Sequence, residues 1–310
     1  MSVSRIAALR ADAWMLLASA IWGAAFVAQH RAADHLDALS IAALRFIAGG
    51  VMLLPLIALR RRSVRGRSPL FTVVGGGLAA GCVMLVAFLL QQRGIEAGST
   101  ASAAGFITGL YVLFVPMIGL LGGLRTHPAV WAGAGMAVGG LYLLSMNAEL
   151  RMSWGDFLVL LCAVAWAVHV LLIGRFSPRC DAIELAAAQF LVTGVLAAFA
   201  LPALPSAQAV RASVWPMLYL GPVAVGIAFT LQVVGQRTAP PAHAAVILSM
   251  EGLFAAAFGA LIGGERLAWG QYAGCALMLV GILVAQWPEF TRRSGASPGA
   301  KADGIPTESC

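Results

Sequence analysis

The chain has 310 residues, of which 60% are hydrophobic and only 11% are charged, and its mean hydropathy is +0.88. Soluble domains carry about 25% charged residues, so this chain has too few to cover a surface that faces water. The composition therefore excludes an ordinary soluble domain and predicts an integral membrane protein. The formal net charge of +7 comes almost wholly from arginine, since Lys301 is the only lysine.

Ten apolar stretches follow one another along the chain, and about 20 such residues cross a bilayer as a helix. The stretches are continuous and lack polar alternation, which favours helices over a β-barrel. We therefore predict an all-α protein with ten transmembrane helices, the fourth of them kinked at Pro116. In chain order the spans cover approximately residues 13–28, 38–59, 70–90, 98–121, 129–145, 157–173, 183–201, 214–234, 242–262 and 267–287.

The basic residues divide unevenly between the two sides of the membrane when the N-terminus is placed in the cytoplasm. Fourteen then lie in cytoplasmic segments and five in outer loops, while Arg45 lies within the second span. This distribution obeys the positive-inside rule and requires an even number of spans, with both termini cytoplasmic. Basic charge thus orients the chain in a bacterial-type inner membrane and does not indicate nucleic-acid binding. The outer group consists of Arg31, Arg93, Arg151, Arg211 and Arg266.

The pattern of residues occurs twice. Trp22 matches Trp166 at an offset of 144, and later positions such as Gly123 and Gly264 match at an offset of 141. Many ordered matches of this kind indicate a duplicated unit with five spans in each copy. Because five is odd, the second copy enters the membrane inverted, as in many secondary transporters. The predicted segments are a cytoplasmic N-terminus at 1–12, a first repeat at 13–146, a second repeat at 147–287 and a disordered cytoplasmic tail at 288–310.

Motifs in both copies resemble one known family over residues 12–287. They are a Ser-Met-Glu run at 249–251, a Gly-Gly-Glu-Arg-Leu run at 263–267, a Trp-Gly pair at 22–23, an Arg-Phe pair at 45–46 and Pro116. The chain resembles the EamA family of the drug/metabolite transporter superfamily. This resemblance implies ten spans and the export of small metabolites by alternating access. It favours amino acids, aromatic ones among them, while other small amphipathic drugs or metabolites remain the alternative.

Glu251 is the acidic residue that lies well inside a predicted span. A charge buried there costs at least ~2.5 kcal/mol, so such a carboxyl is usually paired, solvated or protonated. One interpretation is a proton-coupling or amine-binding group that faces a central cavity, and the other is a hydrogen-bonded carboxyl that holds the ninth span in place. Both stay open, because Gly252 replaces a frequent proline of the family and Leu124 replaces its acidic residue in the first copy.

Aromatic and amide side chains recur at helical spacing along several spans. An apolar helix with one such stripe suits a cavity that binds a molecule with apolar and polar parts. Alternatively, tryptophan gathers at membrane interfaces and glutamine bridges neighbouring helices. The candidate cavity residues are Trp22, Gln29, Phe88, Gln91, Tyr111, Trp166, His169, Phe229, Gln232, Ser249 and Glu251.

Arg45 and His169 are polar residues for which the sequence leaves two roles open. Arg45 can bind a substrate carboxylate, but the family pattern carries this arginine whatever the substrate, and arginine also snorkels to an interface. Its counterpart in the second copy is Gln189. His169 can act as a proton relay, whereas a lone intramembrane histidine is more often a neutral hydrogen-bonding group.

Several motifs are absent from the sequence. It has no P-loop, so neither ATPase activity nor an ATPase partner is implied, and no His-Glu-x-x-His motif. The five cysteines show no Cys-x-x-Cys spacing, so we predict no metal and no cofactor. We predict that the chain is not an enzyme and that its partners are a small-molecule substrate, the lipid bilayer and protons. A channel lacks a readable ring of charged residues, and a membrane-embedded enzyme lacks polar groups clustered at one interface.

Overall fold

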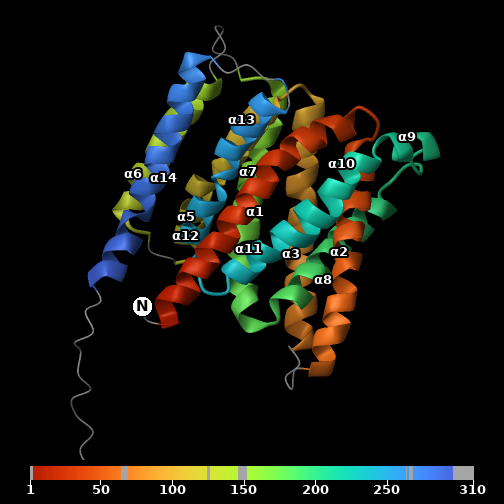
Figure 1. Cartoon of the computed structure of the whole chain (residues 1–310), viewed down its shortest axis with the longest axis horizontal. Coiled ribbons are helices and arrows are strands. Elements are labelled where there is room, and N and C mark those ends of the chain that lie inside the picture. Colours follow the sequence, from red (N-terminus) through yellow and green to blue (C-terminus); the bar gives the residue numbers. More distant parts are fainter. Residues whose placement is uncertain are drawn as a thin grey trace, which may run out of the picture.

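The computed structural model describes residues 3–63, 69–123, 126–145, 152–262, 264 and 268–295. All regular elements within these residues are helical, and these residues contain no strand. The longer helices pack into a single bundle (Figure 1). The prediction of an all-α protein is therefore confirmed for the part of the chain that the structure describes.

Both halves of the chain break their fourth predicted span into two shorter helices. The first half contains α1 (Val3–Ala33), α2 (Ala38–Ser63), α3 (Leu70–Glu96), α4 (Ala101–Gly109), α5 (Tyr111–Leu121) and α6 (Pro128–Ser145). The second half contains α7 (Trp154–Phe176), η1 (Ser177–Arg179), α8 (Ala182–Phe199), α9 (Ala207–Ala212), α10 (Val214–Leu218), the π-helix η2 (Tyr219–Phe229), α11 (Thr230–Gly235), α12 (Pro241–Leu248), α13 (Glu251–Leu261) and α14 (Trp269–Gly295).

Eight segments of the described chain are long and apolar enough to cross a membrane. Two of them, 101–121 and 241–261, consist of the broken helix pairs α4–α5 and α12–α13. The chain is thus a multi-pass membrane protein. Neither α6 nor α14, which correspond to the predicted fifth and tenth spans, is among the eight.

Both ends of the helical region extend further than predicted. The first helix begins at Val3 rather than near residue 13, and α14 continues to Gly295. Helix α14 therefore overlaps the first eight residues of the predicted tail, 288–295. Residues 296–310 of the predicted tail lie outside the described residues.

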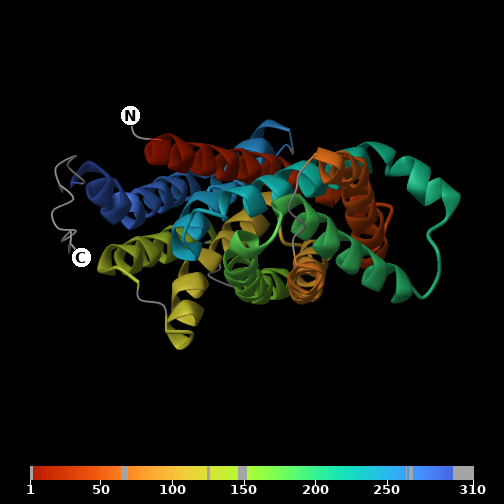
Figure 2. The same ribbon diagram turned by 90° about the horizontal axis from the view of Figure 1, so that it is seen from below.

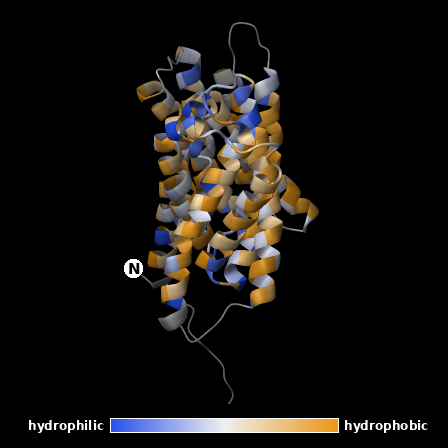
Figure 3. Ribbon diagram, turned by 90° about the vertical axis from the view of Figure 1, so that its right-hand side faces the viewer, coloured by the Kyte–Doolittle hydropathy of each residue, from blue (hydrophilic) through white to orange (hydrophobic). Residues whose placement is uncertain are grey.

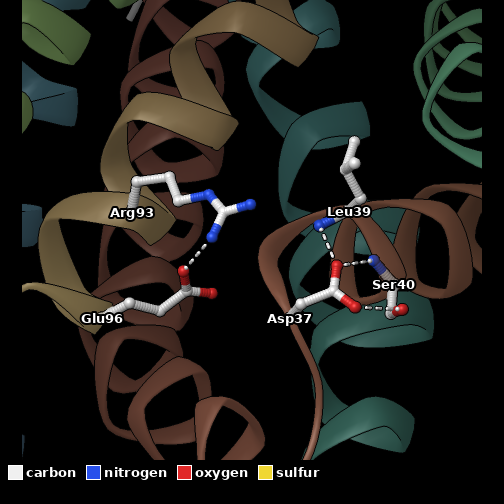
Figure 4. A network of polar contacts seen from close by, with 5 residues as sticks. All are labelled: Asp37, Leu39, Ser40, Arg93 and Glu96. Atoms are coloured by element: carbon white, nitrogen blue, oxygen red, sulfur yellow. Dashed lines mark hydrogen bonds and ion pairs between the residues drawn. The ribbon is translucent and has the colours of Figure 1, made fainter. Parts of the chain in front are cut away.

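Matching carboxylates cap the second helix of each half. Asp37 Oδ1 accepts hydrogen bonds from the N–H groups of Leu39 (2.9 Å) and Ser40 (3.0 Å), and Oδ2 accepts one from the Ser40 hydroxyl (Figure 4). Asp181 occupies the equivalent position and caps α8 in the same way. Each carboxylate satisfies N–H groups that have no partner within the helix. Burial alone would raise the pKa of Asp37, but the hydrogen bonds from Ser40 and Leu39 outweigh it and lower that pKa.

Glycine is required at two equivalent turns and at one helix crossing. Gly123 follows α5 with φ of 79°, and Gly264 follows α13 with φ of 75°, a backbone conformation that glycine adopts readily. At the crossing of α4 and α13, a Cβ atom on Gly105 would lie 2.3 Å from Ala255 Cβ. These backbones approach so closely that a larger residue at Gly105 would force them apart.

Two pairs of equivalent helices, α2 with α8 and α6 with α14, pack antiparallel to each other. In the α2–α8 pair, Gly50 lies against Leu191 while Gly194 lies against Ile47, so residue numbers rise along one helix as they fall along the other. The same relation holds between α6 and α14. These two helices lie side by side at one edge of the bundle in both Figure 1 and Figure 2.

A carboxylate joins the two halves at each end of the bundle. Near the start of α1, at the lower end in Figure 1, Asp12 Oδ1 lies 2.8 Å from His243 Nε2 of α12. At the other end, the Ser99 hydroxyl, which precedes α4, donates a hydrogen bond of 2.8 Å to Asp156 of α7. Asp12 and Asp156 are equivalent in the repeat. The first helix of each half is therefore connected to the broken fourth span of the other half.

Large apolar side chains cover much of the outside of the bundle. Phe71, Leu121 and Phe199 are each more than four-fifths exposed. Figure 3 shows apolar residues along most of the length of the helices. A water-facing surface would not carry so many of them, so this surface is suited to lipid.

Candidate functional site

A cavity lies between the two halves, and the space in it that the centre of a water-sized molecule can reach is about 40 Å³. Its lining side chains come from α1–α5 of the first half and from α7, η2, α11, α12 and α13 of the second, and none comes from α6 or α14. It is lined by Trp22, Ala25, Phe26, Gln29, Arg45, Phe46, Phe88, Gln91, Thr108, Tyr111, Trp166, Val170, Phe229, Gln232, Leu248 and Glu251.

Phe229, the last residue of the π-helix η2, is the centre of an aromatic wall. The ring of Trp22 lies 4.4 Å from it, and the ring of Trp166 stacks on it at 5.5 Å with an angle of 24°. Phe46 and Phe88 meet edge-to-face at 5.5 Å in the same cavity. Aromatic rings prefer such stacked and edge-on geometries. The wall is therefore suited to a ligand with an apolar or aromatic group.

The guanidinium of Arg45 is buried against aromatic rings. Its Cζ lies 4.7 Å from the centroid of the Phe88 ring and 5.2 Å from that of Phe46, in positions where a cation is attracted to a ring face. Within the described residues its Nε and Nη1 atoms have no hydrogen-bond partner. A guanidinium forms paired, charge-assisted hydrogen bonds with carboxylates. Arg45 is therefore suited to an anionic group of a ligand.

Glu251 and Tyr111 are presented to the cavity by the two helix breaks. Glu251 is the first residue of α13, and Tyr111 is the first residue of α5. The phenol of Tyr111 lies beside the carboxyl of Glu251. The positive end of a helix dipole favours an anion at this position. The breaks thus place an acid and a phenol at the middle of the bundle.

Amide side chains supply further polar groups to the cavity. Gln91 Nε2 donates to Thr108 Oγ1 at 3.0 Å, and Gln232 Nε2 donates to Gln236 Oε1 at 2.9 Å. The Oε1 atoms of Gln29 and Gln232 are buried and have no partner in the described part of the chain. Buried polar atoms are usually hydrogen-bonded. These acceptors are therefore suited to water or to a donor group of a ligand.

The cavity contains nine of the eleven candidate residues from the sequence, and it does not contain His169 or Ser249. His169 is held next to Phe229 by a hydrogen bond of 2.9 Å between its Nε2 and Gln189 Oε1. Ser249 lies in the break between α12 and α13 and donates to the Val246 carbonyl instead. In this conformation, therefore, neither residue lines the cavity.

The described residues offer no metal site, because no three His, Cys, Asp or Glu side chains among them lie together. The cysteines at positions 82, 162, 180 and 275 are free. Cys162 is buried beside the Thr108 hydroxyl, with Sγ and Oγ1 3.7 Å apart. Such a thiol behaves as a small apolar group.

Comparison with known proteins assigns the fold to a family. The sequence profile of the EamA-like transporter family matches the chain twice, over residues 9–146 and again over 153–286. The chain belongs to the EamA-like transporter family. One unit of the family thus matches each half of the chain, at ranges close to the two repeats predicted from the sequence.

Relatives of this transporter cover most of its length. An uncharacterized transporter of Archaeoglobus fulgidus is 27% identical over 282 residues, which are 89% of this chain and 85% of the relative. The uncharacterized inner membrane transporter YedA of Escherichia coli is 25% identical over 257 residues, 80% of this chain and 81% of the relative. A crystal structure with 22% identity covers 92% of this chain and 99% of its own with a TM-score of 0.66, which shows a shared fold. Family and relatives indicate a transporter of small molecules rather than an enzyme.

The cavity of the transporter has a symmetric wall but asymmetric charges. Arg45 comes from the first half alone, since its counterpart is Gln189, and Glu251 comes from the second half alone, since its counterpart is Leu110. A carboxylate and a guanidinium are therefore contributed by opposite halves. The symmetric positions are Trp22 with Trp166, Phe88 with Phe229 and Gln91 with Gln232.

Seven lining residues of the transporter were not among the eleven candidate cavity residues, although the sequence had already offered Arg45 as a possible carboxylate-binding group. Arg45 and Phe46 form the Arg-Phe pair of the second span, and a lone charge in an apolar span was the available signal. Phe26 lies one helical turn after Trp22, so the stripe on the first span included it. The sequence gives no comparable signal for the remaining four, which are Ala25, Thr108, Val170 and Leu248.

Proposed function

We propose that the protein is a secondary transporter that exports amino acids, aromatic ones among them, across the inner membrane. The two halves act as inverted five-span repeats that rock about the shared cavity and expose it to one side of the membrane at a time. The observation that carries the proposal is that Arg45 and Glu251 line one aromatic-walled cavity from opposite halves.

An amino acid carries a carboxylate and an ammonium group on one carbon, next to its side chain. In the proposed complex, Arg45 binds the carboxylate by charge-assisted hydrogen bonds, and Glu251 with Tyr111 binds the ammonium. The rings of Trp22 and Phe229 pack against the side chain. The antiparallel packing of α2 on α8 and of α6 on α14 supports inverted repeats, with α6 and α14 as the fifth and tenth spans.

A proton gradient drives export in this proposal, with Glu251 as the coupling group. A carboxyl in an apolar, helix-bounded cavity can hold either a proton or an ammonium group, and competition between the two couples their movements. Both termini face the cytoplasm, as the distribution of arginine requires.

The test is transport by purified protein in liposomes loaded with unlabelled aromatic amino acid. We expect saturable exchange of the external labelled amino acid. We also expect strongly reduced exchange of two analogues with the same side chain, the amine without a carboxylate and the acid without an amino group, because each leaves one buried charge unpaired.

Variants assign each recognition step to a side chain. Arg45→Gln should lose the preference for the amino acid over the amine, and Arg93→Gln, an exposed arginine paired with Glu96, should keep it. Equal exchange of all three compounds by the wild type would contradict the proposed substrate class. Product formation without net movement would indicate an enzyme instead.

A further inference from the structure

A polar pair with unused hydrogen-bonding atoms lies next to the cavity without lining it. His169 and Gln189 are fully buried and are joined by the hydrogen bond from His169 Nε2 to Gln189 Oε1. Gln189 Nε2 and His169 Nδ1 have no partner in the described part of the chain. Phe229 lies beside the pair, with its ring centroid 6.1 Å from that of His169. One donor and one acceptor are thus left unpaired next to the aromatic wall.

The repeat relates this pair to residues that do line the cavity. Gln189 is the counterpart of Arg45, and His169 is the counterpart of Ala25, each at the offset of 144. Arg45 and Ala25 line the cavity, whereas their counterparts do not. Side chains of α2 therefore line the cavity, whereas the equivalent side chains of α8 do not.

We propose that His169 and Gln189 form a second substrate subsite, closed in this conformation and opened when the two halves exchange roles. The proposal rests on the alternating access of the proposed function, because rocking inverted repeats converts each half into the conformation of the other. In the exchanged state Phe229 lies beside Gln189 as Phe88 now lies beside Arg45. The unpaired atoms of Gln189 and His169 then face the cavity.

The subsite takes a neutral or anionic polar group by ordinary hydrogen bonds. Gln189 Nε2 donates to a carboxylate or carbonyl oxygen. His169 carries its hydrogen on Nε2, where it donates to Gln189 Oε1, so its Nδ1 is free to accept a hydrogen bond from a donor. Arg45 offers the same oxygen a charge-assisted hydrogen bond, which is stronger. The substrate is therefore held more weakly at Gln189 than at Arg45.

The two subsites lie toward opposite ends of the bundle. Arg45 lies two turns from the start of α2, and Gln189 lies two turns from the start of α8, the antiparallel counterpart helix. In the proposed topology the start of α2 faces outward and the start of α8 faces the cytoplasm. Gln189 and His169 are then reached from the cytoplasm and Arg45 from outside.

Cysteine labelling tests this arrangement without knowledge of the substrate. Single cysteines Gln189→Cys, His169→Cys and Arg45→Cys are placed in a transporter whose five native cysteines are replaced. A charged, membrane-impermeant methanethiosulfonate reagent is added to inside-out and to right-side-out membrane vesicles. We expect Gln189→Cys and His169→Cys to react from the cytoplasmic side, and Arg45→Cys from the outer side. The matched control is Thr193→Cys, a fully buried site one turn along α8 that packs against Gly81, and it should not react.

Three outcomes would overturn the proposal. The first is no reaction of Gln189→Cys or His169→Cys from either side while Arg45→Cys reacts, which would leave the pair with a packing role. The second is reaction of all three from the same side, and the third is reaction of Thr193→Cys as fast as Gln189→Cys. Reaction as expected without exchange of amino acids would instead uphold the subsite and contradict the proposed substrate.

Discussion

At the scale of single residues, the cavity combines an aromatic wall shared by both halves with one cation and one acid. The sequence predicted the wall because Trp22, Phe88 and their counterparts follow helical spacing, which a straight helix preserves. It could not place Ser249, because the break between α12 and α13 turns that side chain back onto Val246. It left Arg45 undecided, because only the folded chain shows its Nε and Nη1 atoms buried without a partner among the described residues.

Replacing Trp166 by alanine should impair transport far more than stability. The ring of Trp166 stacks on Phe229 at the cavity wall, and losing a stacked partner for the substrate should lower exchange about tenfold. Truncating a core aromatic residue typically costs about 3–5 kcal/mol, but Trp166 borders an existing cavity, so its loss should cost less. Exchange rate and melting temperature are measured on the same preparation.

The control for Trp166→Ala is Phe106→Ala, a fully buried residue of α4 that does not line the cavity. It should lower the melting temperature more than Trp166→Ala does. A similar loss of stability and transport in both variants would assign Trp166 to packing.

Replacing Glu251 by glutamine should abolish coupling and weaken recognition of the amino group. Glutamine keeps the shape and hydrogen-bonding groups of a protonated carboxyl but cannot release a proton or carry the charge that pairs with an ammonium. We expect the variant to fold and to exchange the amino acid more slowly than the wild type, while an imposed pH gradient no longer concentrates substrate. Glu96→Gln, at the end of α3, is the matched control and should behave as the wild type. Concentration of substrate by Glu251→Gln, driven by pH as in the wild type, would leave Glu251 a structural role.

At the scale of elements, the apolar runs located the helices but not their breaks. Pro116 indicated a kink in the fourth span. A proline has no N–H to donate to the carbonyl four residues earlier, which is that of Val112, and the break lies two residues before it, at Leu110. No proline marks the matching break between α12 and α13. The π-helix η2 contains Pro222, and π-helical segments often occur at functional sites. Such local departures depend on tertiary packing, which an apolar run does not encode.

Asp37→Ala should destabilise the protein through the start of α2, and more at neutral than at acid pH. Loss of a capping carboxylate typically costs about 1 kcal/mol. The folded protein lowers the pKa of Asp37 from 3.8, so the ionised group adds stability above that pH, and this stability is lost as pH falls through the lower folded value. The difference in melting temperature between wild type and variant should therefore shrink below about pH 4. Asp34→Ala, which changes an exposed neighbour in the same turn, is the control and should leave the melting temperature close to that of the wild type.

At the scale of the whole molecule, the duplication was readable from the sequence and the relative placement of the halves was not. Composition predicted a multi-pass membrane protein. It did not show that α6 and α14 would pair at one edge, away from the cavity lining (Figure 2). Their role as the fifth and tenth spans remains a prediction. Apolar helices that face lipid and helices that face each other have similar compositions, so composition cannot assign neighbours.

The orientation of the molecule can be tested at two exposed residues. Asp34 lies in the turn between α1 and α2, and Arg179 lies at the end of η1. With the N-terminus in the cytoplasm, Asp34→Cys should react with an impermeant thiol reagent from outside and Arg179→Cys from the cytoplasm. Intact cells and inside-out vesicles give the two measurements. The reverse pattern would invert the proposed topology and with it the direction of export.

The carboxylate links at the two ends of the bundle bear on how the chain matures. The first helix is made early, yet Asp12 finds His243, Trp22 Nε1 donates to the Ala224 carbonyl, and Gly23 packs on Phe254, all in the second half. A half-synthesised chain therefore inserts helices whose partners do not yet exist. We expect residues 1–146 expressed alone to be degraded, and to be rescued by separate expression of residues 147–310. On this expectation, neither half of the transporter is stable in the membrane until the contacts between the two halves have formed.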